Sequence, residues 1–487
     1  MMNNIFIDLV TNEWYLFLLF LISIIILISL SELSLRKKIW STHANRIIIH
    51  ITVGIAVSLT PHIFTTSLQP ALLALIFFLI NLISYKNKML NSFHSIGRVS
   101  YGTIFFPLSY LLIAIPFWDY PIHITISLML LAIADPIAAI VGENINRPVS
   151  YTILTDKKTV QGSVAMFICS MIIIFILSNY FFHDWNLDFQ IVAAICIGLA
   201  VTMAEAISYK GSDNLTIPII AFLFIELFNQ INKNGLIKDY FLFVALIFLI
   251  LFISYKRKYL SISGFIGAVI MAILLYGFGG SSYIYPLVVF FIISSILSHF
   301  KKDKFEIKKS NRNISQVYAN GGVALFICII NYFYYHDLMY PCFLASVAAA
   351  NSDTWGTELG IISNKTPIDI ISRREIAPGT SGGITLIGTI GSILGSLVIG
   401  LVGHFFYISF NLLLLVIISG FLSSIIDSIL GSTVQARYIS PDGFIITEKY
   451  KKSFYLFTGS NKMNNDIVNL YCTLSGPFIF LLLFSII

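Results

Sequence analysis

The chain has 487 residues, of which 57% are hydrophobic and only 11% are charged. This composition excludes an ordinary water-soluble domain and predicts a membrane protein built from apolar helices. The net charge of +6 does not indicate a nucleic-acid partner, because basic cytoplasmic loops facing anionic lipids account for it.

Apolar segments long enough to cross a bilayer of about 30 Å recur along the whole chain. We predict an all-α fold, a polytopic membrane helix bundle of about 14–16 transmembrane helices in two related halves. The first segment follows residues 1–10, which contain no Lys or Arg, so we expect a membrane helix there rather than a cleaved signal peptide. The segments begin near Trp14, Ile47, Pro70, Thr103, Ile122, Ser163, Phe189, Leu215, Tyr240, Ser261, Tyr283, Gly321, Pro341, Ile384, Phe406 and Ile467.

Basic residues collect in alternate loops of this predicted topology. If every second loop is cytoplasmic, all of the 30 Lys and Arg except Lys233 and Lys238 lie on that side. This positive-inside pattern predicts a multi-pass protein of the cytoplasmic membrane. Both termini then lie outside, and the polar loops that carry the candidate sites lie on the cytoplasmic side.

The basic turn 256–258 separates two halves, residues 1–255 and 256–487, that share an order of features. Asp135 stands seven residues before Gly142, as Asp353 stands before Gly360. In each half a polar loop then leads into an apolar helix. We interpret the shared order as an ancient duplication or a fusion of two related enzymes. Later acidic residues match in the same order, Glu205 with Asp427 and Asp213 with Asp466.

The second half carries a polar helical segment, Asn351 to Gly360, in otherwise apolar surroundings. A helix places Asp353 and Thr357 on one face. An acid inside a membrane helix is costly and indicates function, although Asp353 could instead lie in interfacial water at a helix end.

A glycine-rich loop follows that segment. We expect it to present backbone N–H groups at the start of a helix, where free amides and the helix dipole bind anions. The alternative is an ordinary glycine turn. The candidate phosphate-binding residues in this loop are Gly379, Thr380, Gly382 and Gly383.

The first half offers comparable chemistry, with basic residues just before a helix start. Phosphoryl transfer needs positioned phosphates and charge neutralisation, by Mg²⁺ held on carboxylates and by cationic or amide donors. Neither a GxxxxGK[ST] loop nor a protein-kinase motif set occurs, which argues against those classes. The candidate phosphate- or nucleotide-binding residues are Lys157, Lys158, Thr159, Gly162 and Ser163. The candidate catalytic residues are Asp135, Glu205, Asp213, Asp353, Asp427 and Asp466, and all of these except Glu205 are candidate Mg²⁺ ligands.

Two further polar clusters stand where predicted cytoplasmic loops meet helices. Arg46 and His50 are four residues apart and therefore share a helix face. They are candidates for binding a nucleotide or phosphate, although a membrane histidine can also be a hydrogen-bonded packing residue. Arg312, Gln316 and Asn320 stand at the corresponding place in the second half.

Together these residues resemble two families. The first half resembles the membrane-bound phytol, farnesol and dolichol kinases, through Arg46-x3-His50, Asp135-Pro136, the 157–163 loop, Glu205-Ala206 and Asp213-Asn214-Leu-Thr-Ile-Pro218. The second half resembles the integral membrane family that includes plant phytyl-phosphate kinase, through Gln316 to Gly321, Ser352 to Gly360, Pro378 to Gly383, Asp427 to Gln435 and Asn465 to Asn469.

The resemblance implies a bifunctional lipid kinase of isoprenoid salvage. Residues 1–255 would phosphorylate a prenyl alcohol of the phytol, farnesol or geranylgeraniol type. Residues 256–487 would convert the prenyl phosphate to the diphosphate. The expected donor is a nucleoside triphosphate, CTP by resemblance, with Mg²⁺ as cofactor and the lipid bilayer as the source of substrate.

Two other functions remain open at this point. A membrane transporter with duplicated halves also has intramembrane carboxylates and would place them near the bilayer midplane. The kinase interpretation instead expects all six candidate acids at the cytoplasmic end of the helices. A CTP-dependent lipid cytidylyltransferase fits the lysine-bearing loop Lys157 to Ser163, but that family's His-Gly-Gly and Asp-Arg-x-Asp ending is absent.

Overall fold

The computed structural model describes residues 13–87, 100–305, 311–363, 365–406, 408–442, 446–448, 450 and 453–486, and the structural statements that follow concern these residues. The expectation for residues 1–10 lies outside them. So do parts of three predicted basic loops, at 88–98, at 306–310, and at 449 and 451–452.

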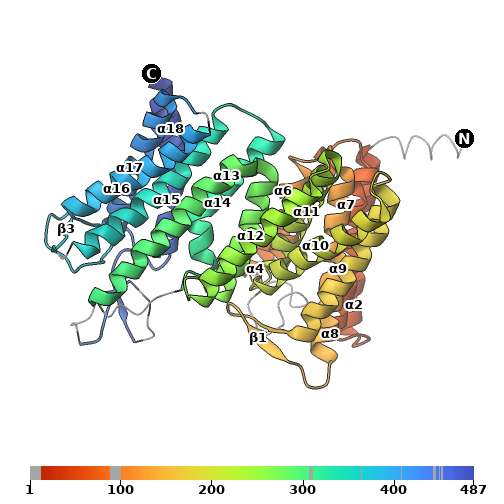
Figure 1. Ribbon diagram of the computed structural model, residues 1–487. Coiled ribbons are helices and arrows are strands. Elements are labelled where there is room, and N and C mark those ends of the chain that lie inside the picture. The colour runs from red at the N-terminus through yellow and green to blue at the C-terminus, as the bar shows by residue number, and fades with distance from the viewer. Residues whose placement is uncertain are drawn as a thin grey trace, which may run out of the picture. The chain divides into compact units, whose positions relative to one another are not determined.

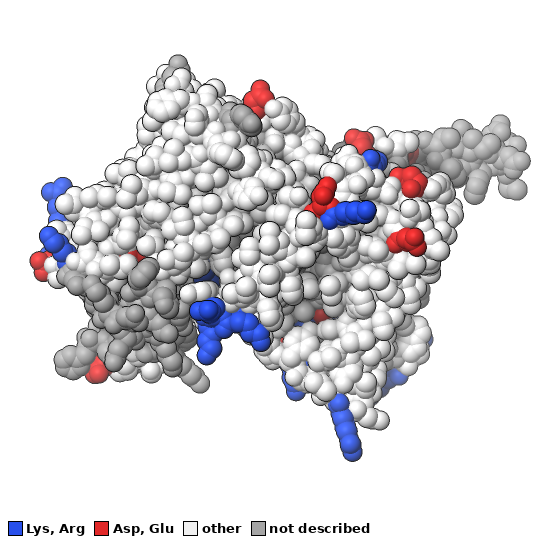
Figure 2. Space-filling view, viewed as in Figure 1, with Lys and Arg blue, Asp and Glu red and all other residues white. Residues whose placement is uncertain are grey.

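The protein is a multi-pass integral membrane protein built from helices, as predicted. Within the described chain, 13 helices are long and apolar enough to cross a membrane. Many large apolar side chains on them are exposed, for example Leu242 at 73% and Leu386 at 76%. Such a surface suits lipid rather than water. Figure 2 shows how few charged side chains interrupt the visible face.

Tertiary contacts divide the chain into two compact units, residues 1–238 and 239–487. The division falls one helix before the predicted boundary at 255. The helix after it, α12 (Ile237–Lys256), belongs to the second unit because its aromatic residues pack on α13 (Ile262–Phe305). Phe243 stacks on Tyr276 with ring centroids 3.5 Å apart, and Phe248 meets Phe265.

The first unit is a helical bundle with one small hairpin (Figure 1). Two short irregular turns interrupt it, a 3₁₀ turn at Thr60–His62 and a π-helical turn at Leu130–Ala134. Its other elements are α2 (Glu13–Arg36), α3 (Thr42–Ser58), α4 (Leu68–Asn87), α6 (Gly102–Ala114), α7 (Pro121–Met129), α8 (Asp135–Asn144), β1 (Ser150–Thr152), β2 (Lys157–Thr159), α9 (Val160–Phe181), α10 (Leu187–Ala206) and α11 (Asp213–Asn234).

The second unit is built around α15 (Met339–Ile362), whose residues 341–352 are all buried. Helix α13 is broken at Gly280, whose φ of 65° favours glycine, which accounts for the two apolar segments predicted there. The remaining elements are α14 (Ile314–Phe333), β3 (Ile368–Asp369), β4 (Gly383–Ile384), α16 (Leu386–Phe405), α17 (Phe410–Thr433), β5 (Arg437–Ile439), β6 (Ile446–Thr447), β7 (Tyr455–Thr458) and α18 (Asn465–Ile486).

The two units share an order of helix packing. Helices α8 to α11 contact their successors in turn, as α15 to α18 do. Thr159 caps α9 by accepting from the Gly162 amide at 3.1 Å, and Thr385 caps α16 by accepting from the Gly388 amide at 3.0 Å. Both glycines lie against the preceding long helix, near Gly142 and Gly360 respectively. This agreement supports an internal repeat and corrects its register, because Thr385 rather than Thr380 matches Thr159.

Candidate functional site

The first unit encloses a cavity of about 890 Å³, which falls within the usual size range of ligand sites. All ten residues predicted as site residues in this half line it. Loop ends and helices distant in sequence therefore meet at one place. The ten residues are Arg46, His50, Asp135, Lys157, Lys158, Thr159, Gly162, Ser163, Glu205 and Asp213.

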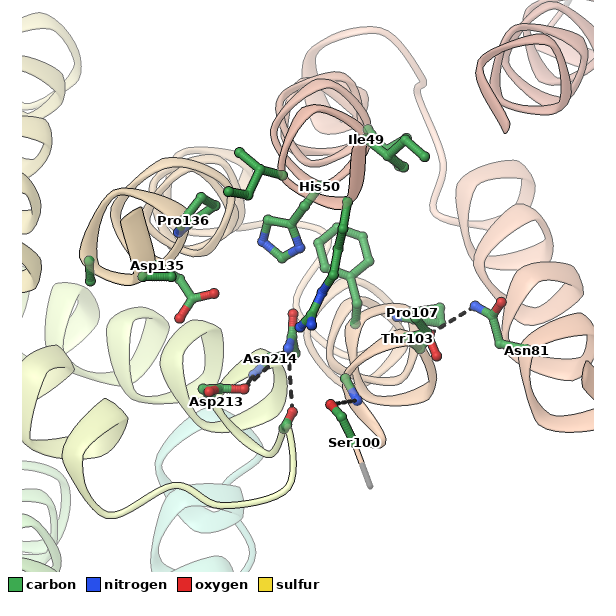
Figure 3. Close-up of a pocket in the computed structure, with 18 of the residues that line it drawn as sticks. Ile49, His50, Asn81, Ser100, Thr103, Pro107, Asp135, Pro136, Asp213 and Asn214 are labelled. Carbon is green, nitrogen blue, oxygen red and sulfur yellow. Dashed lines mark hydrogen bonds between the residues drawn. The ribbon is translucent and has the colours of Figure 1, made fainter. Parts of the chain in front are cut away.

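Asp135 owes its position to the π-helical turn that precedes it. Pro136 has no N–H, so it cannot donate to a carbonyl of the preceding turn. The Nε2 atom of His50 lies 3.0 Å from the Leu131 carbonyl oxygen, and it must carry hydrogen there because a carbonyl only accepts. His50 thus supports the widened turn from which the Asp135 side chain reaches the cavity (Figure 3). Widened turns of this kind are frequent at functional sites.

Lys158 forms a mostly buried ion pair with Glu205. Its Nζ lies 2.5 Å from Glu205 Oε1 and also contacts the Glu205 backbone carbonyl, and both side chains are 13% exposed. The hairpin β1–β2 positions the lysine, with Tyr151 opposite Lys158. Burial opposes the charge on Lys158, but the nearby carboxylates of Glu205 and Asp213 outweigh it and raise the lysine pKa. The ion pair therefore fixes the Lys158 ammonium group at the edge of the cavity.

The third carboxylate of the cavity, Asp213, begins α11. Its Oδ1 accepts from the Asn214 amide at 3.0 Å and from the Asn214 side chain at 3.2 Å. Asn214 is 5% exposed and lies directly against Gly102, so a close approach of α6 to α11 holds it in place. In Figure 3, Asp135, His50 and Asp213 come from three helices and surround a common space.

Beyond these polar groups the cavity is apolar and runs between α2, α3, α4 and α6. Residues such as Ile28, Val53 and Phe77 line this part. From Arg46 to Val57, which both line the cavity, α3 rises about 16 Å at 1.5 Å per residue. One end of the cavity therefore suits phosphates, and the long remainder suits a hydrocarbon chain.

A proline inside α6 adds a polar contact to the apolar wall. Pro107 cannot donate to the Thr103 carbonyl four residues earlier. The Asn81 side chain on α4 donates to that carbonyl instead, at 2.8 Å (Figure 3). Sequence reasoning missed Asn81, although a proline within an apolar segment is a signal that some carbonyl needs another partner.

In the second unit, close packing of α15 on α16 positions the polar segment. The Asn351 side chain donates to the Gly395 carbonyl at 2.7 Å, and the Ser352 hydroxyl donates to the Ser392 carbonyl at 2.8 Å. A Cβ on Gly395 would lie 2.8 Å from the Asn351 carbonyl oxygen. Small residues on α16 therefore allow the backbones to approach, as is common in membrane helix pairs.

Two of the three candidate acids of this half, Asp353 and Asp427, lie close together in this unit. Their carboxyl groups are within hydrogen-bonding reach. Asp427 is 9% exposed, and its Oδ2 atom has no hydrogen-bond partner among the described residues. Glu358 accepts from the Ser298 hydroxyl at 2.9 Å and interacts electrostatically with Arg312. Arg312, which was predicted to bind phosphate, thus lies within electrostatic range of a protein carboxylate.

The prediction that the Gly379 to Gly383 turn opens a helix is wrong. Gly383 belongs to strand β4, which pairs with β3, and α16 starts at Leu386 behind its Thr385 cap. The turn's amides also have partners. Thr380 N–H donates to the Ala377 carbonyl and Gly383 N–H to the Thr380 carbonyl.

Side chains between residues 435 and 448 form hydrogen bonds with this turn. The Ser381 amide donates to Glu448 Oε1 at 2.8 Å, and the Gln435 side chain donates to the Ser381 hydroxyl at 2.9 Å. Arg437 donates to the Ser381 carbonyl at 2.5 Å. Sequence reasoning missed Arg437 and Glu448 as site neighbours, because no motif or matched order in the two halves marks them.

Asp369 anchors the start of the same loop. The carboxylate is 3% exposed and accepts from the Ser372 amide at 2.7 Å and the Ser432 hydroxyl at 2.9 Å. Burial opposes its charge, but these hydrogen bonds outweigh burial and hold the pKa of Asp369 below the ordinary value.

The remaining predicted residues of this half lie at helix starts. Gln316 forms a capping box with Asn313 at the start of α14. The Asn469 side chain donates to that of Asn320 at 3.5 Å, which joins α14 to α18. Asp466 lies half-buried in the first turn of α18.

The acids differ in depth along their helices. Glu205, Asp213 and Asp466 lie at helix ends. Asp135 and Asp353 each stand nine residues before the end of their helix, about 14 Å along the axis. The expectation that all six acids lie at a helix end is therefore wrong for these two.

Carboxylate oxygens in both units are chemically suited to a divalent cation. Among the described residues, no group of three or more His, Cys, Asp and Glu side chains is arranged to hold a metal ion. Glu205 Oε2 and Asp427 Oδ2 are buried oxygens without a hydrogen-bond partner in the part of the chain that the structure describes. Mg²⁺ is commonly held by one or two carboxylates plus substrate phosphates and waters. The donor set present matches that mode of binding.

Comparison with known proteins adds relatives over parts of the chain. Residues 245–477 match the family described as integral membrane protein DUF92. An uncharacterised membrane protein, MJ0933, of Methanocaldococcus jannaschii is 30% identical over 47% of this chain and 87% of its own. Protein PGR of Arabidopsis thaliana is 31% identical over 47% of this chain and 91% of its own. A phytol kinase of Synechocystis is 29% identical over 39% of this chain and 81% of its own. No solved structure matches.

Proposed function

Because the chain belongs to the DUF92 family of integral membrane proteins through residues 245–477 and is distantly similar to a phytol kinase, we propose that it is a prenol kinase. The first unit transfers a phosphoryl group from a nucleoside triphosphate, CTP by the resemblance noted above, to a prenyl alcohol. The second unit phosphorylates the resulting prenyl phosphate. The observation that carries the proposal is the amphiphilic cavity, with acids and cations at one end and a hydrocarbon-lined channel behind them.

In the first unit, the alcohol's chain lies between α3, α4 and α6 with its hydroxyl at Asp135. The hydroxyl oxygen forms a bond to the γ-phosphorus, the bond from that phosphorus to the bridging oxygen breaks, and the hydroxyl proton passes to the Asp135 carboxylate. Lys158 and Arg46 neutralise phosphate charge. Asp135 and Asp213 would hold Mg²⁺, which supplies further charge neutralisation.

In the second unit, Asp353 and Asp427 take the corresponding roles. The acceptor there is a phosphate monoester, which is largely ionised at neutral pH because its second pKa is about 6. That step therefore needs charge neutralisation more than a base. Two adjacent acids with a buried oxygen free for a cation suit that requirement.

The test is product analysis with purified protein, Mg²⁺, a prenol such as phytol, and each of the four nucleoside triphosphates. We expect both prenyl monophosphate and diphosphate from the wild type, with CTP the best donor. Asp135→Asn forms neither product from the alcohol but still converts added prenyl monophosphate. Asp353→Asn accumulates the monophosphate.

Two controls accompany these variants. Asp188→Asn removes an exposed carboxylate from the opposite end of α10, and Asp337→Asn removes one from the loop before α15. Both should keep both activities. A CDP-lipid with released pyrophosphate would instead indicate a cytidylyltransferase, and no phosphorylated lipid under any condition would reject the proposal.

A further inference from the structure

We propose that Tyr110, fixed by Thr60, closes the apolar end of the first unit's cavity and limits the length of the alcohol that the site accepts. The inference rests on the proposed function, since it concerns the substrate of the same cavity. Both residues line the cavity, and both are 1% exposed.

The order of lining residues along the helices places Tyr110 at the end remote from the acids. On α6 the cavity is lined from Gly102, beside Asn214, to Tyr110, a rise of about 12 Å. On α3 the lining runs from Arg46 to Val57, and Thr60 follows in the 3₁₀ turn. Two neighbouring walls thus end at the Tyr110–Thr60 contact.

Hydrogen bonding fixes the phenol ring in this position. The Thr60 hydroxyl donates to the Val57 carbonyl at 2.6 Å, which uses its single hydrogen. The Tyr110 hydroxyl, 2.8 Å away, must therefore donate to Thr60. A ring held at its hydroxyl and 1% exposed cannot swing aside readily for a longer chain.

The packing beyond Tyr110 is dense. Ile113 and Ala114, one turn further along α6, are 2% and 0% exposed. A chain that reached Tyr110 would meet the ring and then closely packed side chains, whose displacement is costly. The ring is therefore the side chain whose truncation lengthens the channel.

The experiment compares wild type, Tyr110→Phe, Tyr110→Leu and Tyr110→Ala on prenols of increasing length, from geraniol through farnesol and geranylgeraniol to a longer polyprenol. Tyr110→Ala should raise the rate ratio of the longest to the shortest accepted alcohol by about tenfold, since a pocket discriminates on this scale for small apolar increments. Tyr110→Leu should shift it less, and Tyr110→Phe should leave it nearly unchanged because the ring remains. The matched control is Ile113→Ala, which truncates an equally buried side chain of the same helix.

Binding of the alcohols can be measured separately from catalysis. Thermal stabilisation of each variant by the same alcohols reports binding. It should extend to longer alcohols most in Tyr110→Ala, less in Tyr110→Leu, and not in Tyr110→Phe or Ile113→Ala. If the wild type transfers no phosphate but shows this length-dependent binding, the proposed kinase function fails and the role of Tyr110 stands. An unchanged length profile in Tyr110→Ala, or the same shift in Ile113→Ala, overturns the inference.

Discussion

Replacing Asn81 by leucine tests how the proline-containing wall of the cavity is stabilised. The Asn81 amide donates to the Thr103 carbonyl, which Pro107 leaves without its helical partner. Leucine has a similar size but no donor, so the substitution leaves that carbonyl unpaired. Leaving a buried acceptor unpaired costs about 1–3 kcal/mol in proteins, and side-chain hydrogen bonds within membranes average about 0.6 kcal/mol. We expect Asn81→Leu to reduce the free energy of unfolding by about 1 kcal/mol.

The cause is tested by a double-mutant cycle with Pro107→Ala. Alanine restores an N–H that can donate to the Thr103 carbonyl within α6. In that background Asn81→Leu should leave the free energy of unfolding almost unchanged. The coupling free energy should be about 1 kcal/mol. Reversible unfolding in mixed micelles measures it, with Asn179→Leu on an exposed position of α9 as control. An equal cost of Asn81→Leu in both backgrounds would refute this explanation.

Three further predictions follow from the ion pair, the α15–α16 contact and the loop anchor. Lys158→Met leaves Glu205 buried without its cation and should destabilise the first unit by about 3–5 kcal/mol. Adding Glu205→Gln should recover part of that loss, and denaturant titration of the single and double variants measures both effects. Gly395→Leu should abolish formation of the diphosphate while the first phosphorylation continues, whereas Leu394→Ala on the exposed face keeps both, as product analysis will show. The folded-state pKa of Asp369 is lowered, so its contribution to stability is fully present above its unfolded pKa and is lost as pH falls through the folded value. The difference in melting temperature between the wild type and Asp369→Asn should therefore be largest near neutral pH and should begin to shrink as the pH falls below about 4.

Hydrophobic length and loop charge were sufficient to predict the helices and the acidic residues that meet in each unit. Length suffices because the backbone N–H and C=O groups of a membrane segment must form hydrogen bonds within that segment. An apolar segment of sufficient length is therefore helical. Asp135, Glu205 and Asp213 were grouped correctly because each adjoins a loop predicted on the same side. Asp353 and Asp427 were matched to them by order alone, and α15 and α17 bring these two together.

Contacts that depend on irregular backbone geometry could not be predicted from sequence patterns. The π-helical turn before Asp135 and its contact with His50 arise from a missing N–H at Pro136 and from packing of α3 on α7 and α8. The glycine-rich turn was misplaced because Thr380 and Thr385 both precede glycines, and the sequence does not show which threonine caps the helix. Only pairing of β3 with β4 settles that choice.

The most direct test of the account is transfer of label from γ-labelled nucleoside triphosphate to a prenol by the purified protein. The account predicts labelled prenyl phosphate with the wild type and none with Asp135→Asn, at equal folded protein. Equal labelling by the two proteins would contradict the assignment of the first unit's cavity as the site. Absence of labelled lipid from the wild type, with every nucleotide and prenol length tried, would contradict the kinase function itself.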